Sequence, residues 1–430
     1  MPALSLALIP LVVLFVMTFV LSMPLPLGFF ASTFAYFWAS GGDIGLAAQR
    51  ALTQLNTKYI IIAVPLFVFT ANVMNRGKVT EILFGFANKL IGAIPGALGH
   101  VNAVVSLIFS GMTGSEVADV SGIGMMSVEA MTDAGYDKDF SCAVSAATAT
   151  VGPIFPPSIP MVFYAMLTGA SIGKLFLGGM LPALILTPTL MAIIGVISWR
   201  RGYPTADRFS VKAFLISAFK SLPALITPVI LLGGIYTGVF TPTEAGAAAA
   251  AYGLVVAIFV YRALGPKALW EVLVDTVRKT GMLSLLVGSA FVFSYIVASE
   301  NIPAYIQSWL FSITQDPLGL FFIIIGFFLV IGMFVDTSTQ ILIFIPMVIP
   351  AVEAAGIDLI HFGVAVVLTM MLSLDTPPFG VSLFIISGVT DTPLGPIIRE
   401  VVPFVIGEIF VNVLIILVPP LVLFLPRLLG

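Results

Sequence analysis

The chain has 430 residues, of which 59% are hydrophobic and only 9% are charged. Ordinary soluble proteins carry about 25% charged residues, so this composition excludes a set of water-soluble domains and indicates a protein embedded in lipid. The net charge of −3 excludes a nucleic-acid-binding protein, and the single cysteine excludes a disulfide framework or a cysteine metal centre. The two histidines are too few for a haem or zinc centre.

The apolar segments are long runs without alternation, which predicts membrane-spanning helices and excludes the strands of a membrane barrel. The first run has no basic segment before it and no small-residue cleavage site, so we expect a retained span and no signal peptide. We expect spans near Leu4–Leu21, Gly28–Ser40, Tyr59–Met74, Phe176–Ser198, Leu222–Phe240, Ala245–Tyr261, Gly281–Ser299 and Val401–Leu425.

Two regions, Val101–Val151 and Leu320–Leu372, contain many Gly, Ser, Thr and Asp residues and are each followed by a Pro-Pro pair. The two regions repeat each other, since Gly111, Pro156-Pro157 and Pro182 recur 221 positions later as Gly332, Pro377-Pro378 and Pro403. A constant shift over about 70 residues indicates an internal duplication.

The basic loop between Trp199 and Lys220 is predicted to be cytoplasmic by the positive-inside rule. Threading outward from it, we treat residues 97–132 and 318–352 as re-entrant hairpins, and with that topology the first enters from the cytoplasm and the second from outside. Each is followed by a broken helix, over residues 140–168 and 361–390. We therefore predict an all-α polytopic membrane protein built from two inverted repeats, 1–220 and 221–430, which is typical of secondary transporters.

Four polar segments lie within these apolar surroundings. Ser110 to Ser115 combines hydroxyls and glycines with Asp119 nearby, and Gly152 to Ser158 contains three prolines that leave backbone carbonyls without helical partners. Such oxygens suit a small cation such as sodium. The alternatives are a small-residue packing face for the first segment and a repaired proline kink for the second.

The repeat partners are Gly332 to Gln340, which contains Asp336, and Ser373 to Gly380, which contains Asp375. An ionisable residue at this depth indicates a functional site, although each carboxylate could instead cap a broken half-helix. Arg50 lies in an amphipathic segment, where it meets either an anionic ligand or the lipid headgroups. Glu244, three residues after Thr241, is predicted to cap a helix N-terminus.

At these residues the sequence resembles the large membrane subunit, DctM-like, of tripartite ATP-independent periplasmic (TRAP) transporters. The resemblance covers nearly the whole chain. One departure is Asp119, where many members carry Thr. Its motifs are Val64-Pro65-Leu66-Phe67, Gly114-Ser115-Glu116-Val117-Ala118-Asp119, Pro156-Pro157-Ser158-Ile159-Pro160, Thr241-Pro242-Thr243-Glu244-Ala245-Gly246 and Asp375-Thr376-Pro377-Pro378.

The resemblance implies a multi-pass protein of the bacterial inner (cytoplasmic) membrane that works by an elevator mechanism, with a transport domain moving past a scaffold. It implies sodium-coupled import of an organic acid anion, a small four-span membrane subunit and a periplasmic substrate-binding protein as partners. It also implies about two sodium sites. The first is Ser110, Gly152, Phe155 and Pro157, and the second is Gly332, Ser373, Thr376 and Phe379. Substrate or gating candidates are Ser115, Asp119, Ser158, Asp336, Asp375 and Arg50.

Three other functions compete with this one. A stand-alone sodium/carboxylate symporter or antiporter of the same broad superfamily would show the same broken helices. An intramembrane aspartyl enzyme lacks its signature motifs here, so no enzyme is predicted. A passive channel is disfavoured by the inverted broken helices. The sequence contains no nucleotide-binding loop, so it does not indicate ATP as the direct energy source.

Overall fold

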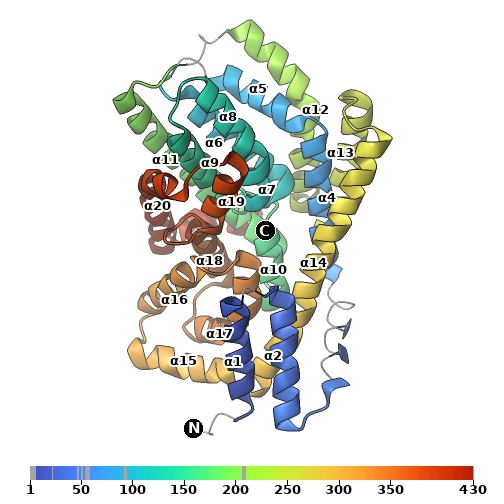
Figure 1. The fold of residues 1–430 in the computed structure, drawn as a ribbon, viewed down its shortest axis with the longest axis vertical. Helices are drawn as coiled ribbons and strands as arrows, with labels where there is room; N and C mark the ends of the chain where they lie inside the picture. Colours follow the sequence, from blue (N-terminus) through green and yellow to red (C-terminus); the bar gives the residue numbers. More distant parts are fainter. Residues whose placement is uncertain are drawn as a thin grey trace.

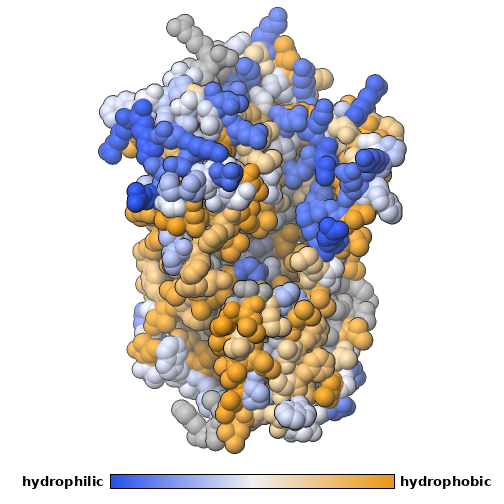
Figure 2. Space-filling view, viewed as in Figure 1, coloured by the Kyte–Doolittle hydropathy of each residue, from blue (hydrophilic) through white to orange (hydrophobic). Residues whose placement is uncertain are grey.

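The computed structural model describes residues 6–21, 23–45, 48–49, 52–53, 59–91, 94–205 and 210–429. Within these ranges every regular element is a helix, apart from an isolated bridge between Pro95 and Thr205 (Figure 1). The prediction of an all-α protein is confirmed for this part of the chain. Figure 2 shows hydrophilic residues gathered at the upper end of the molecule and hydrophobic residues over its middle, as expected of a protein that crosses a membrane.

Six of the described helices are long and apolar enough to span a membrane. They are α11 (Ile172–Arg201), α12 (Val211–Tyr236), α13 (Pro242–Val255) with its continuation η3 (Val256–Val260), α14 (Pro266–Ser299), α17 (Thr337–Ala354) and α20 (Leu394–Leu417). A seventh candidate is the pair α15 (Ile302–Ile313) and α16 (Pro317–Gly332), which is bent by 119°. The chain is therefore a multi-pass membrane protein.

The ends of the chain differ in detail from the sequence-based spans. The first two expected spans form the shorter helices α1 (Leu8–Val20) and α2 (Leu25–Ser40), of 13 and 16 residues. The expectation of one span over Val401–Leu425 is wrong, because α20 ends at Leu417 and α21 (Pro420–Leu429) follows. Pro419 causes this break, since proline has no amide hydrogen to continue a helix.

The long helices pack into two groups. In the first, α4 (Ala63–Arg76) packs on α13 and α14, while α12 packs on α13 and on α5 (Val79–Ile91). In the second, α11 packs on α20 and on α6 (Ala97–Thr113), and α9 (Lys138–Ala149) and α18 (Leu359–Leu374) both pack on α20. Figure 1 shows α14 running along one side of the molecule, with α9, α18 and α20 on the other.

Short helices complete the second group around two chain reversals and two helix breaks. The first reversal joins α6 to α7 (Glu116–Asp119), η2 (Val120–Gly124) and α8 (Met125–Asp133), and the second joins α16 to α17. The breaks separate α9 from α10 (Ile159–Thr168) and α18 from α19 (Val381–Thr390). α10 packs on α17 and α19 packs on η2, so the second half of each broken helix contacts the other half of the chain.

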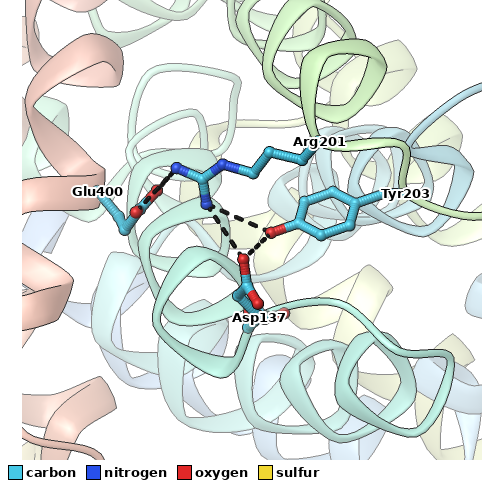
Figure 3. Close-up of polar contacts among 5 residues, drawn as sticks. Asp137, Arg201, Tyr203 and Glu400 are labelled. Atoms are coloured by element: carbon cyan, nitrogen blue, oxygen red, sulfur yellow. Dashed lines mark hydrogen bonds and ion pairs between the residues drawn. The ribbon is translucent and has the colours of Figure 1, made fainter.

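One end of the second group is held by a polar cluster (Figure 3). Arg201, at the end of α11, donates two hydrogen bonds to the Glu400 carboxylate of α20, at 2.9 and 2.8 Å. Arg201 also lies 3.4 Å from Asp137, which accepts a hydrogen bond from the Tyr203 hydroxyl. The cluster thus ties the ends of α9, α11 and α20 together.

Candidate functional site

The first reversal and the first helix break meet through their backbones. α6 ends at Thr113, and the next residue, Gly114, adopts a left-handed conformation (φ +60°). The Gly114 carbonyl accepts a hydrogen bond from the Ile159 amide at 3.3 Å. A Cβ atom at Gly114 would lie 2.2 Å from the Pro157 carbonyl oxygen, so only glycine fits this position. Ser115 and Ser158 each cap a helix that starts here, α7 and α10.

The four members of the first predicted sodium site lie at or beside this junction. The Ser110 hydroxyl is 3.7 Å from the position that a Cβ atom on Gly152 would take, and Pro157 contacts the reversal through Gly114. Phe155 lies against the same segment, since its ring is 3.6 Å from a Cβ position on Gly111. The Ser110 hydroxyl donates to the Ser106 carbonyl, so its oxygen lone pairs remain free to accept.

The second reversal meets the second break in a similar way. A Cβ atom on Gly332 would lie 1.8 Å from the Ser373 hydroxyl, and the Met333 carbonyl accepts from the Gly380 amide at 3.4 Å. Ser373 and Thr376 donate to carbonyls of their own helix at 2.7 and 2.6 Å. The Phe379 side chain turns toward Phe334, with ring centroids 5.0 Å apart.

The oxygen atoms that can coordinate a cation at these junctions belong mainly to hydroxyl and carbonyl groups. Among the described residues, no group of three or more His, Cys, Asp or Glu side chains is placed to hold a metal ion. Backbone carbonyls and Ser or Thr hydroxyls are therefore the main oxygen ligands that either junction offers to a cation, and the buried carboxyl of Asp375 lies beside Thr376 in the second junction. Hard oxygen ligands of this kind fit sodium and do not fit zinc or copper.

Residues of both reversals and of both helix breaks line one cavity of about 450 Å³, and none of the eight residues of the two predicted sodium sites is among its lining residues. One wall of the cavity is formed by residues of α4 and α14, and the facing wall by residues of the two reversals and the two helix breaks. Residues at or next to the starts of α10, α17 and α19 line it, namely Ile159, Thr337 and Val381. Helix N-termini carry partial positive charge, so the starts of α10 and α19 favour an anionic ligand, whereas the start of α17 is capped by the Asp336 carboxylate. Glu116 and Asp336 also line the cavity.

The three aspartates predicted to contact substrate or gate the site differ in their hydrogen bonding. Asp336 caps α17, because its carboxylate accepts from the Thr339 amide at 3.1 Å, which matches the capping alternative. Asp375 does not cap a helix: it is fully buried, and neither carboxyl oxygen has a hydrogen-bond partner among the described residues. Both oxygens of Asp119 are likewise buried without such a partner in the described part of the chain. Arg50 lies outside the described residues.

Sequence reasoning did not single out three further residues. Glu116 is buried beside the first reversal and accepts a hydrogen bond from Ser382 at the start of α19. Glu408 is buried in α20 and contacts Thr150 at the first break, while Lys279 of α14 lines the cavity. Glu408 could have been found, since it is an acidic residue within a long apolar run.

Comparisons with known proteins agree with this architecture. A family model described as "Tripartite ATP-independent periplasmic transporter, DctM component" matches residues 8–421. The sialic acid TRAP transporter large permease protein SiaM of Vibrio cholerae is 38% identical over 385 residues, which cover 90% of each chain. The C4-dicarboxylate TRAP transporter large permease protein DctM of Pseudomonas aeruginosa is 36% identical, over 88% of this chain and 89% of that protein.

One further relative and one solved structure show how far the fold extends. The permease protein SiaT of Haemophilus influenzae is 36% identical over 410 residues, which cover 95% of this chain but 66% of SiaT. The crystal structure of the Alcanivorax borkumensis YdaH transporter superposes with a TM-score of 0.62 at 15% identity, over 85% of this chain and 86% of that one, and so shares the fold.

These relatives are transport permeases, which fits the prediction that the chain is not an enzyme. The match over nearly the whole chain confirms the resemblance seen in the sequence motifs. The chain belongs to the family of DctM components, the large permease subunits of tripartite ATP-independent periplasmic transporters.

Proposed function

We propose that this chain imports a small organic acid anion across the bacterial inner membrane, driven by sodium. The observation that carries the proposal is the cavity of about 450 Å³ whose lining includes residues of both reversals and of both helix breaks. The N-termini of α10 and α19 and the positive charge of Lys279 favour an anion, and they act against the carboxyl groups of Glu116 and Asp336, which also line the cavity. The cargoes named for relatives, sialic acid, C4-dicarboxylate and isethionate, are all organic anions.

Two sodium ions bind at the two junctions in this proposal. Site one comprises Ser110, Gly152, Phe155 and Pro157, and site two comprises Gly332, Ser373, Thr376 and Phe379. Support comes from the close approach of Ser110 to Gly152 and of Gly332 to Ser373. Bound sodium would supply the coupling to its gradient, since one charge entering an interior at −100 mV releases about 2.3 kcal/mol from voltage alone.

The movement is proposed to be of the elevator type. The group around α9, α11, α18 and α20 carries both junctions and therefore serves as the transport domain. The group around α4, α12, α13 and α14 supplies the facing wall and serves as the scaffold. Ser115, Asp119, Ser158, Asp336 and Asp375 lie in or beside the reversals and breaks, where they contact substrate or gate the cavity in this scheme.

The partners in this proposal are a small four-span membrane subunit and a periplasmic substrate-binding protein. The family description, tripartite and periplasmic, supports them. The chain covers 66% of SiaT and 65% of the isethionate permease protein DctMQ, so these relatives contain a further segment. We assign to that segment the role of the small subunit.

The test is uptake into liposomes that contain this chain with its small subunit, with the binding protein outside. N-acetylneuraminate, succinate and isethionate are offered with sodium, and then with choline in its place. We expect saturable uptake of at least one anion that requires sodium. Uptake that continues undiminished in choline would contradict the sodium coupling, and efficient uptake without the binding protein would favour a stand-alone symporter.

A further inference from the structure

A single cationic side chain lies at the cavity wall contributed by α4 and α14. Lys279 of α14 is the only basic residue among the described residues that line the cavity. Its neighbours in that wall are mainly apolar and include Val68 and Ala71 of α4 and Met282 and Leu283 of α14. Lys279 is therefore the one positively charged side chain, among the described lining residues, that can meet an anion in the cavity.

The Lys279 ammonium is already held by two partners. It lies 2.8 Å from the carboxylate of Asp275, one helical turn away, and donates to the Asn72 side-chain oxygen of α4 at 3.2 Å. Asn72 is fixed in turn, because its amide nitrogen donates to the Thr276 hydroxyl at 3.0 Å. These contacts point the ammonium group across the α4–α14 contact, and its third N–H is available to a ligand.

Asp275 is the residue that balances this charge, and it does not itself line the cavity. The side chains of Lys279 and Asp275 are 51% and 45% exposed, so the ion pair between them is weak and can exchange with another anion. An anion in the cavity can therefore take over the ammonium group without the cost of breaking a buried salt bridge.

We propose that Lys279 binds the anionic group of the transported substrate, and that Asp275 lowers the affinity by competing for the same ammonium. This inference rests on the proposed function and deepens it. The cavity then selects ligands that carry a carboxylate or sulfonate over neutral ligands of the same size. The rest of the ligand contacts hydroxyl-bearing residues of the reversals, such as Ser115 and Ser338.

The test is a set of matched charge changes on one helix. Lys279→Gln removes the cavity charge, and Asp275→Asn removes its competitor. Arg278→Gln is the control, because Arg278 is an exposed neighbour on α14 that does not line the cavity. The dissociation constants of N-acetylneuraminate, succinate and isethionate are measured by calorimetry in sodium, on the chain with its small subunit in nanodiscs.

For the anion that the parent binds best, we expect Lys279→Gln to weaken binding roughly tenfold and Lys279→Arg to weaken it less. Asp275→Asn should tighten binding a few-fold, and this gain should vanish when Lys279→Gln is added. The Arg278→Gln control should stay within about twofold of the parent, and a neutral amide of the same acid should bind parent and Lys279→Gln alike.

The two ways of failing are distinct. If the parent binds an anion and Lys279→Gln binds it as tightly as Arg278→Gln does, the role of Lys279 is wrong while the proposed function stands. If the parent binds none of the three anions, the proposed function is wrong and the inference falls with it.

Discussion

The Thr150 hydroxyl, at the first helix break, lies 2.9 Å from the Oε1 atom of Glu408 in α20, 258 positions further along the chain. The same hydroxyl lies 2.6 Å from the Ala147 carbonyl, and both side chains are fully buried. A hydroxyl has one proton to donate, so both bonds are complete only when Glu408 carries a proton and donates. The geometry therefore favours an uncharged Glu408 next to the first helix break.

The first prediction tests this protonation state. Glu408→Gln should be tolerated, with a melting temperature within about 2 °C of the parent, because the amide can donate to Thr150 as a neutral carboxyl does. Thr150→Val should cost about 1–3 kcal/mol of stability, since it leaves a buried carboxyl without its partner. Thermal unfolding in detergent measures both changes.

Thr189→Val is the control for the loss of a threonine hydroxyl, because Thr189 bonds only the Ile185 carbonyl of its own helix among the described contacts. Its melting temperature should stay close to that of the parent. A larger loss of stability in Glu408→Gln than in Thr150→Val would show that Glu408 is charged.

The second prediction concerns the close contact at the second junction. Gly332→Ala places a Cβ atom 1.8 Å from the Ser373 hydroxyl oxygen. This distance is shorter than any van der Waals contact, so α16 and α18 must move apart. Overpacking of this kind costs about 1–3 kcal/mol or more, and we expect lower stability together with loss of uptake. Gly326→Ala, on the same helix, meets no atom within 4 Å and should behave as the parent does. Equal behaviour of the two variants would mean that α16 and α18 are not in close contact here.

Local patterns in the sequence predicted local structure well. Thr241 and Glu244 form the expected capping box at the start of α13, in which the Glu244 carboxylate accepts from the Thr241 amide at 2.8 Å. All the atoms of this motif lie within four residues, so the sequence alone contains the information. The composition likewise predicted the helical class, since apolar runs in lipid must satisfy their backbone internally.

Contacts between distant segments could not be predicted in this way. Glu408 and Thr150, and Lys279 and Asn72, are brought together only by the packing of separate helices. Asp336 and Asp375 occur in similar apolar surroundings, yet one caps α17 and the other is buried without a described partner. The difference depends on where each helix begins: Asp336 precedes α17, whereas Asp375 follows the end of α18.

The third prediction addresses the polar cluster in Figure 3. Arg201 uses its Nη2 atom for both oxygens of Glu400 and its Nη1 atom for Asp137. Arg201→Lys cannot keep both partners in this way, because a lysine side chain has a single terminal nitrogen. The Arg201 side chain is 35% exposed, so we expect a modest loss of about 1 kcal/mol that shrinks at high salt. Arg200→Lys, at the exposed neighbouring position, should be neutral. A loss of the same size in Arg200→Lys would show that the cluster adds nothing specific.

The last prediction tests the two proposed sodium sites. The hydroxyls of Ser110 and Thr376 donate to the Ser106 and Leu372 carbonyls, which leaves their oxygens free to accept a cation. A contact of hydrogen-bond strength to a charge is worth about 1.5–3 kcal/mol, so Ser110→Ala or Thr376→Val should each weaken sodium activation by roughly one to two decades. Valine nearly matches threonine in shape, so packing should survive.

The double variant should lose more than either single variant and show a shallower dependence on sodium, because both sites belong to one moving body in the proposed mechanism. Asp43→Asn is the control, since Asp43 is exposed and its carboxylate bonds the nearby Gly45 amide. Initial uptake rates are measured over a range of sodium concentrations, in liposomes that contain equal amounts of each reconstituted variant. If Ser110→Ala and Thr376→Val were activated by sodium as the parent is, both site assignments would be wrong, while membership of the family would stand.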